Sequence, residues 1–173
     1  MELWDVYDKD RNKVGRTIVR GSEFREGDYH LVVHICIFNS RNEMLIQKRQ
    51  PFKDNYSGMW DVTVGGSAVA GDSSQQAASR ELLEEVGIKM DFTGMRPQFT
   101  INFPHGFDDF YILRRDDLDI ADLKLQYEEV EQVKWATKDE VLAMLGRGEF
   151  IPYHASLLQF LFAAQTSYGA HRA

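Results

Sequence analysis

The feature that most constrains the fold of this chain is a predicted helix, from the Asp72–Ser74 segment to Val86, with an acidic face and an apolar face. Successive helical residues turn by about 100°, so Glu85 lies about 40° to one side of Glu81 and Glu84 about 60° to the other. The apolar side chains are expected to turn the other way, toward a core: Leu82, Leu83 and Val86.

Both ends of this helix are marked in the sequence. Residues Asp72–Ser74 offer side-chain oxygens to the free N–H groups of the first turn, and Gly87 is suited to end the helix. Ala77 and Ala78 lie on the arc of the acids one turn earlier, so we expect an open approach to the carboxylates.

Three clustered carboxylates repel one another, so at neutral pH they require either protons or a cation. Oxygen ligands suit Mg²⁺ or Mn²⁺, and Mg²⁺ commonly bridges carboxylates to substrate phosphates. Arg80 lies four residues before Glu84 and is expected to pair with it. A solvated helix face is the alternative for an isolated Glu-Leu-Leu-Glu-Glu sequence.

The rest of the chain interleaves predicted strands and helices. Alternating residues around a turn predict a β-hairpin over residues 3–19. The apolar run 29–38 and residues 44–48 predict a second hairpin whose first strand is central and buried. Further strands are predicted at residues 60–64, 97–103, 107–113 and 130–135, and helices at 138–145 and 155–165. This order favours a mixed sheet covered on both faces.

Composition narrows the class of function. The chain has 173 residues and a net charge of -7, which disfavours binding to a nucleic-acid polymer or to a membrane surface. Its apolar stretches, 31–38 and 157–164, are far shorter than the roughly 20 residues that span a bilayer. The single cysteine, Cys36, cannot form an intramolecular disulfide, and the N-terminus lacks a signal-peptide pattern. We therefore expect a reducing, cytoplasmic setting.

The spacing around the acidic helix resembles a known signature. Gly66, five residues, Asp72, seven residues and then Arg80-Glu81-Leu82-Leu83-Glu84-Glu85-Val86-Gly87-Ile88 resemble the box of the Nudix hydrolase superfamily. The resemblance implies an α/β fold, the Nudix α/β/α sandwich with a mixed sheet, in a domain over residues 28–173 that follows a β-hairpin extension over residues 1–27. It also implies that Arg80 orients the glutamates and that divalent metal is bound by the Gly65 carbonyl, Glu81, Glu84 and Glu85.

One position departs from the signature, because Asp72 stands where the family usually has Glu. The substitution keeps the charge and shortens the reach by one methylene group. Two roles are open for Asp72: support of the metal site through its charge, or capping of the helix.

Outside the box, the chain resembles the branch of the superfamily that contains isopentenyl-diphosphate isomerase, over Tyr29–Ser40, Met44–Arg49 and Gly58–Gly66. The isomerases need a cysteine just after the Trp-containing strand, and the corresponding Thr63–Ser67 segment has none. Cys36 lies in a predicted buried strand, where a cysteine is most often a small hydrophobic residue. Hydrolysis is therefore favoured over isomerisation, and an inactive Nudix binding module is the third alternative.

The same resemblance supplies candidates for substrate contacts. Arg49 and Lys53 align with basic residues that hold the diphosphate in the isomerase branch. Glu128 and Glu129 lie where many Nudix enzymes place an extra carboxylate. His105 lies in a turn and is expected at the surface rather than in the cleft. Four aromatic side chains are candidates for stacking on a nucleobase: Phe52, Tyr56, Phe103 and Phe107.

The sequence thus predicts a Mg²⁺- or Mn²⁺-dependent pyrophosphohydrolase that cleaves a diphosphate linkage in a nucleoside diphosphate derivative or a nucleoside di- or triphosphate. The resemblance implies a metal that neutralises phosphate charge and lowers the pKa of a water. Glu81 is the first candidate for the general base, and Glu129 is the second. The expected partner is a small nucleotide or diphosphate, and assembly as a homodimer is left open.

Overall fold

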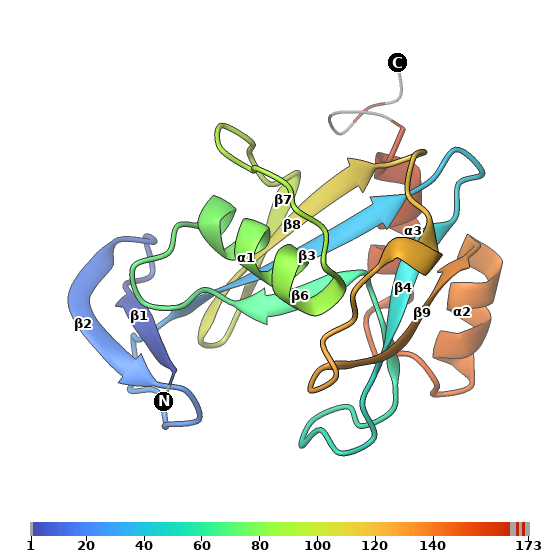
Figure 1. Cartoon of the computed structure of the whole chain (residues 1–173). Helices are drawn as coiled ribbons and strands as arrows, with labels where there is room; N and C mark the ends of the chain where they lie inside the picture. Colours follow the sequence, from blue (N-terminus) through green and yellow to red (C-terminus); the bar gives the residue numbers. More distant parts are fainter. Residues whose placement is uncertain (1, 167–168, 170, 172–173) are drawn as a thin grey trace.

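A seven-stranded mixed sheet forms the centre of this computed structural model, which describes residues 2–166, 169 and 171 (Figure 1). Its strands are β3 (His30–Phe38), β4 (Met44–Arg49), β5 (Trp60–Asp61), β6 (Val64–Ser67), β7 (Phe99–Phe103), β8 (Gly106–Arg114) and β9 (Val130–Ala136). The order is β5-β4-β3-β8-β7, with β6 also paired to β3 and β9 to β4. Only the β3–β8 pair among them is parallel, so the predicted mixed sheet is confirmed.

Helices cover both faces of the sheet. Successive side chains of β3 point to opposite faces and therefore pack in two different cores. Ile35 and Ile37 pack in the core under α1 (Ser74–Val86), whereas Cys36 and Phe38 pack in the core that includes α2 (Lys138–Gly146) and α3 (Ala155–Ala164). The sandwich and the buried position of Cys36 are as predicted. None of the helices in the described ranges has the length and hydropathy needed to cross a membrane.

The segment predicted as one strand over residues 60–64 is two strands with different neighbours. Trp60 and Asp61 pair with β4, whereas β6 pairs with β3. Between them, the Thr63 hydroxyl accepts from the Ile37 N–H and donates to the Leu45 carbonyl, so it stands between β3 and β4. The predicted hairpin of β3 and β4 consequently pairs at Phe38 and Met44 and opens beyond that point.

The helix α1 follows its predicted boundaries, and its N-cap lies within the predicted Asp72–Ser74 segment. Ser73 is the N-cap and forms a capping box with Gln76, and Gly87 ends the helix with a left-handed φ of 74°. The prediction that Ala77 and Ala78 flank an open approach to the acids is wrong, because both are fully buried against the sheet. Leu83 was placed on the apolar face but is 48% exposed.

The predicted N-terminal hairpin is present as β1 (Leu3–Tyr7) and β2 (Lys13–Val19), and it packs against the sheet. The Trp4 indole stacks on His30 at 4.5 Å between ring centroids, and Phe24 stacks on the same imidazole. Burial lowers the pKa of His30 to about 4, so this ring is neutral in its aromatic stack at neutral pH.

An ion pair with a buried carboxylate ties the hairpin to β8. The Arg11 guanidinium donates to both oxygens of Asp109, at 3.0 and 2.8 Å, and Thr100 and Ser74 donate to the same carboxylate. Burial of Asp109 opposes its ionisation, but the hydrogen bonds from Arg11, Thr100 and Ser74 outweigh burial and lower its pKa.

We expect Asp109→Asn to lower the free energy of unfolding by about 2 kcal/mol at pH 7, because an amide replaces the charge that pairs with Arg11. A lowered pKa stabilises the folded state above the usual value of 3.8, and this stabilisation is lost as the pH falls through the lowered pKa. Urea unfolding should therefore show the two proteins converging below pH 3.8. The control is Asp10→Asn, whose pair with Lys9 is exposed. Equal stability of wild type and Asp109→Asn at pH 7 would contradict the tether.

Candidate active site

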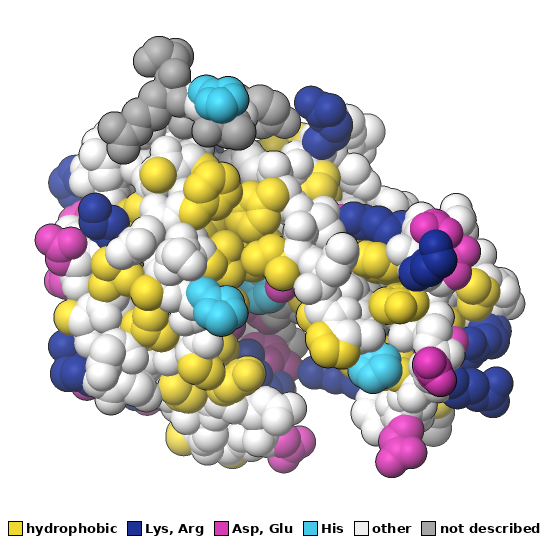
Figure 2. Space-filling model, turned by 180° about the vertical axis from the view of Figure 1, so that it is seen from behind, with side chains coloured by type: hydrophobic (Ala, Val, Ile, Leu, Met, Phe, Trp, Pro, Cys, Tyr) yellow, Lys and Arg dark blue, Asp and Glu magenta, His cyan; other side chains and the backbone are white. Residues whose placement is uncertain are grey.

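The acidic side of α1 borders a pocket of about 610 Å³. Its walls come from α1, β3, β6 and β8, from the N-terminal hairpin, and from loop residues around 126–129 and 151–153. The molecular surface is hollowed on the face opposite the view of Figure 1, with charged side chains visible at the bottom of the hollow (Figure 2).

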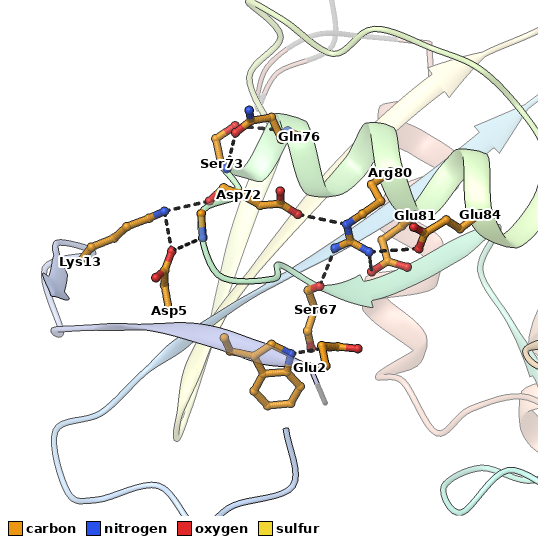
Figure 3. A network of polar contacts seen from close by, with 12 residues as sticks. Glu2, Asp5, Lys13, Ser67, Asp72, Ser73, Gln76, Arg80, Glu81 and Glu84 are labelled. Atoms are coloured by element: carbon orange, nitrogen blue, oxygen red, sulfur yellow. Dashed lines mark hydrogen bonds and ion pairs between the residues drawn. The ribbon is translucent and has the colours of Figure 1, made fainter. Parts of the chain in front are cut away.

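The Arg80 guanidinium organises the acidic side of this pocket (Figure 3). Its Nη1 donates to Glu81 at 2.8 Å and to Glu84 at 3.2 Å, and its Nη2 donates to the Ser67 carbonyl at 3.0 Å. The pairing of Arg80 with Glu84 is as predicted. One cation therefore fixes two of the three glutamates relative to the end of β6.

Asp72 contacts this arrangement from the other side. Its Oδ2 accepts from Arg80 Nε at 3.1 Å, so the shorter acid still reaches the guanidinium. The alternative role as helix cap is wrong, since Ser73 caps α1. Asp72 therefore acts on the glutamates through Arg80.

Glu85 is the most buried of the three acids, with 4% of its surface exposed. Its Oε2 accepts from the Gln47 amide at 2.8 Å. Burial raises the pKa of Glu85 well above its usual value, and the charge of Glu81 adds to the shift. Burial also raises the pKa of Glu81, against the effect of Arg80. Two desolvated carboxylates side by side fit a site that takes up a cation.

The backbone of β6 lies directly against these side chains. A Cβ at Gly66 would collide with the Glu81 carboxylate, and a Cβ at Gly65 would lie 2.8 Å from the His34 ring. Gly65 lines the pocket, and its role as a carbonyl ligand stays a prediction. Glycine at position 66 thus leaves the space that the Glu81 carboxylate occupies.

The carboxylates of Glu81, Glu84 and Glu85 do not meet at one common position. Within the described residues, no group of three or more His, Cys, Asp or Glu side chains is close enough to hold a metal ion. Arg80 engages Glu81 and Glu84, and Gln47 engages Glu85. A divalent cation would therefore draw the carboxylates away from these partners.

The residues predicted to contact the substrate, Arg49 and Lys53, differ in their access to the pocket. Arg49 lines the pocket, and its Nε donates to the Asn55 carbonyl at 3.3 Å. Lys53 does not line it and pairs instead with both oxygens of Glu129 at 2.7 Å. Glu129 lines the pocket, whereas Glu128 is exposed outside it.

Two of the four aromatic candidates reach the pocket. Tyr56 and Phe103 line it, whereas Phe107 is buried in the core and Phe52 packs against Tyr127 at the surface. His105 is exposed, as expected, and stacks on Phe24.

Sequence reasoning missed the second wall of the pocket. His34, Asp61, Asp108 and Tyr153 all line it and form one hydrogen-bonded chain. Burial alone would lower the pKa of His34, but Asp108 outweighs burial and raises it. The available signal was a polar residue inside an apolar strand, at His34 in β3 and at Asp108 in β8.

The N-terminal extension, predicted from the sequence to precede the domain, also contributes residues to the pocket. Glu2 and Arg20 line the pocket and pair with each other at 3.1 Å. The Trp4 indole N–H donates to Glu2 at 2.6 Å, which fixes this carboxylate at the rim (Figure 3).

Comparison with known proteins identifies the family and the fold. The family model of the NUDIX domain matches residues 28–157. An uncharacterized Nudix hydrolase of Listeria monocytogenes is 45% identical over 153 residues, which cover 88% of this chain and 90% of that protein. An isopentenyl-diphosphate Delta-isomerase of Pectobacterium atrosepticum is 32% identical over 104 residues, 60% of this chain and 56% of the isomerase. The crystal structure of DR0079 from Deinococcus radiodurans has a TM-score of 0.74 at 23% identity and covers 92% of this chain and 99% of that one.

The fold and the acidic pocket therefore define a protein of the Nudix fold. The chain belongs to the Nudix family, and its enzyme class is the one predicted from the sequence, a hydrolase of phosphoric anhydrides.

We expect Gly66→Ala to fold normally and to displace the Glu81 carboxylate, because the added methyl group meets the flexible end of that side chain. Binding of Mn²⁺, measured by electron paramagnetic resonance, should weaken by about 10-fold or more. The matched control is Gly146→Ala, where a Cβ meets nothing within 4 Å. Equal Mn²⁺ affinity in the two variants would show that Glu81 does not bind the ion.

Proposed function

We propose that this chain is a Mg²⁺- or Mn²⁺-dependent pyrophosphohydrolase that cleaves a diphosphate linkage in a nucleoside diphosphate derivative or a nucleoside di- or triphosphate. The observation that carries the proposal is the pair of desolvated carboxylates, Glu81 and Glu85, on the wall of a pocket that also receives Arg49. A pocket with acids and a basic residue suits a phosphate group that arrives with a divalent cation.

Each residue of the site has a role in this proposal. Glu81, Glu84 and Glu85, with the Gly65 carbonyl, would hold the ion, which supplies neutralisation of phosphate charge and a lower pKa for a water. Arg80 keeps Glu81 and Glu84 in position when no ion is bound. Arg49 binds a phosphate oxygen through its guanidinium.

Lys53 supports the site indirectly. Because it contacts both oxygens of Glu129 at 2.7 Å, neither oxygen is free to approach a water while this ion pair is closed. Glu81 offers Arg80 only its Oε1. We therefore keep Glu81 as the first candidate for the general base and Glu129 as the second, with Lys53 reaching the diphosphate only after this ion pair opens.

The proposal extends to the location and the partners of the enzyme. A cytoplasmic location is supported by the cysteine content, because the one cysteine of the sequence, Cys36, is buried and forms no disulfide. A small-molecule partner rather than a nucleic-acid polymer or a membrane is supported by the net charge of -7. A homodimer stays a prediction, to be tested by sedimentation.

We expect Glu84→Gln and Glu85→Gln each to lose about 100-fold or more of the hydrolysis rate, because each removes a charge that the ion requires. Both variants should stay folded, since less repulsion remains between the acids. Product formation with Mg²⁺, followed by separation of the nucleotides and phosphate products, measures the rate, and Glu128→Gln, an exposed acid outside the pocket, is the control. Full turnover by either variant, or by wild type in excess chelator, would refute the metal assignment.

The substrate is found by the same assay. The panel consists of nucleoside di- and triphosphates, sugar nucleotides, dinucleoside polyphosphates and isopentenyl diphosphate. Absence of Mg²⁺-dependent formation of nucleoside monophosphate, phosphate ester, phosphate or diphosphate from every nucleotide in the panel would argue against the proposal.

The rival isomerase activity would require a reactive cysteine. Cys36 is fully buried, and burial raises the pKa of its thiol well above the usual value, which disfavours the thiolate. We expect Cys36→Ala to cost about 1–2 kcal/mol of stability and to leave hydrolysis unchanged. Isomerisation of isopentenyl diphosphate, followed by nuclear magnetic resonance, should be absent in both proteins. Conversion by the wild type that is lost in Cys36→Ala would reverse the assignment.

A further inference from the structure

The pocket wall that faces away from α1 carries a continuous chain of hydrogen bonds for which hydrolysis has no use. His34 Nδ1 lies 2.6 Å from Asp108 Oδ1, and His34 Nε2 lies 3.1 Å from the Tyr153 hydroxyl. The Tyr153 hydroxyl lies 2.8 Å from Asp61 Oδ1, to which it donates. The four residues come from β3, β8, the segment before α3, and β5.

The order of protons along this chain determines what the wall can offer a ligand. Because the Tyr153 proton goes to Asp61, the Tyr153 oxygen must accept from His34 Nε2. The other ring nitrogen of His34, Nδ1, is hydrogen-bonded to Asp108 Oδ1. The donors of the chain are therefore satisfied internally, and the groups left over are acceptors.

Those acceptors are one oxygen of Asp61 and one of Asp108. Among the described residues, neither Oδ2 receives a hydrogen bond, whereas Asp61 Oδ1 accepts from both Tyr153 and the Val62 N–H. Asp61 is only 4% exposed and lines the pocket, so its free oxygen is accessible from the pocket alone.

The pocket that contains these oxygens has a mainly polar lining, with a few apolar side chains among the polar ones. Val32, Phe103 and Ile151 line the same pocket. A largely buried carboxylate oxygen that receives no hydrogen bond gains most from a ligand that brings a donor, since it otherwise depends on water.

We propose that Asp61 and Asp108 bind the non-phosphate end of the substrate by accepting hydrogen bonds from its hydroxyl or amino groups. The proposal rests on the proposed hydrolase function and names its substrate class: a diphosphate whose other end carries donors, in a sugar or on the edge of a base. An alkyl diphosphate supplies no such donor. Tyr153 and His34 are positioning residues that hold the two carboxylates.

The test compares Asp108→Asn and Asp61→Asn with wild type on matched substrates. Each variant keeps the oxygen used inside the chain and turns the free acceptor into a donor. We expect kcat/KM for GDP, ADP-ribose and UDP-glucose to fall by about 10- to 100-fold, while turnover of isopentenyl diphosphate is unchanged. Asp116→Asn, on the exposed surface and outside this pocket, is the control.

Two further arms separate the sources of the donors. Inosine diphosphate lacks the amino group of GDP, and 2′,3′-dideoxy-GDP lacks the ribose hydroxyls. The analogue that lacks the recognised donor should bind wild type weakly and should lose little further affinity in the variants. Losses of equal size on all substrates, isopentenyl diphosphate included, or no loss on any, would overturn the proposal.

A second measurement keeps this test separate from the hydrolase proposal. Titration calorimetry with non-hydrolysable methylene diphosphonate analogues of GDP and of isopentenyl diphosphate reports binding without turnover. If nothing is hydrolysed but the Asn variants lose affinity for the GDP analogue alone, the hydrolase function fails and the donor-binding wall stands. Should Asp61→Asn unfold in the assay, Asp108→Asn decides the outcome.

Discussion

The Arg80 guanidinium is the contact on which the acidic site depends. It pairs with Asp72, Glu81 and Glu84 and also donates to the Ser67 carbonyl at the end of β6. Without a cation in this position, acids on one helix face would repel one another and turn toward solvent. Arg80 instead holds them beside the sheet, where burial of Glu81 and Glu85 makes a second, divalent cation favourable.

The loop that leads into α1 is held in turn by the N-terminal hairpin. Asp5 accepts from the Gly71 N–H, and Lys13 pairs with Asp5 and donates to the Asp72 carbonyl (Figure 3). These contacts place Asp72 against Arg80, so the hairpin acts on the site through the loop as well as through its own pocket residues. The extension is therefore part of the machinery that positions the acids.

Local patterns of the sequence predicted those parts of the architecture that depend on residues close together in the chain. The boundaries of α1, the Arg80–Glu84 pair and the burial of Cys36 depend on residues near each other in sequence, where the helical and strand periods apply. The His34 chain joins residues that are 74, 119 and 92 positions apart, and no local period relates them. Lys53 and Glu129 were each identified, but their mutual ion pair across 76 positions was not.

The split of the 60–67 segment explains why both walls of the pocket exist. Because Thr63 stands between β3 and β4, the chain leaves β4 after Asp61 and joins β3 at Val64. Asp61 is thereby left on the donor-binding wall, while Gly65 and Gly66 continue beside His34 and Glu81. A single straight strand would have kept its pairing with β4 and carried these glycines away from α1. The partner switch at Thr63 therefore brings Asp61 of β5 and the two glycines of β6 into one pocket.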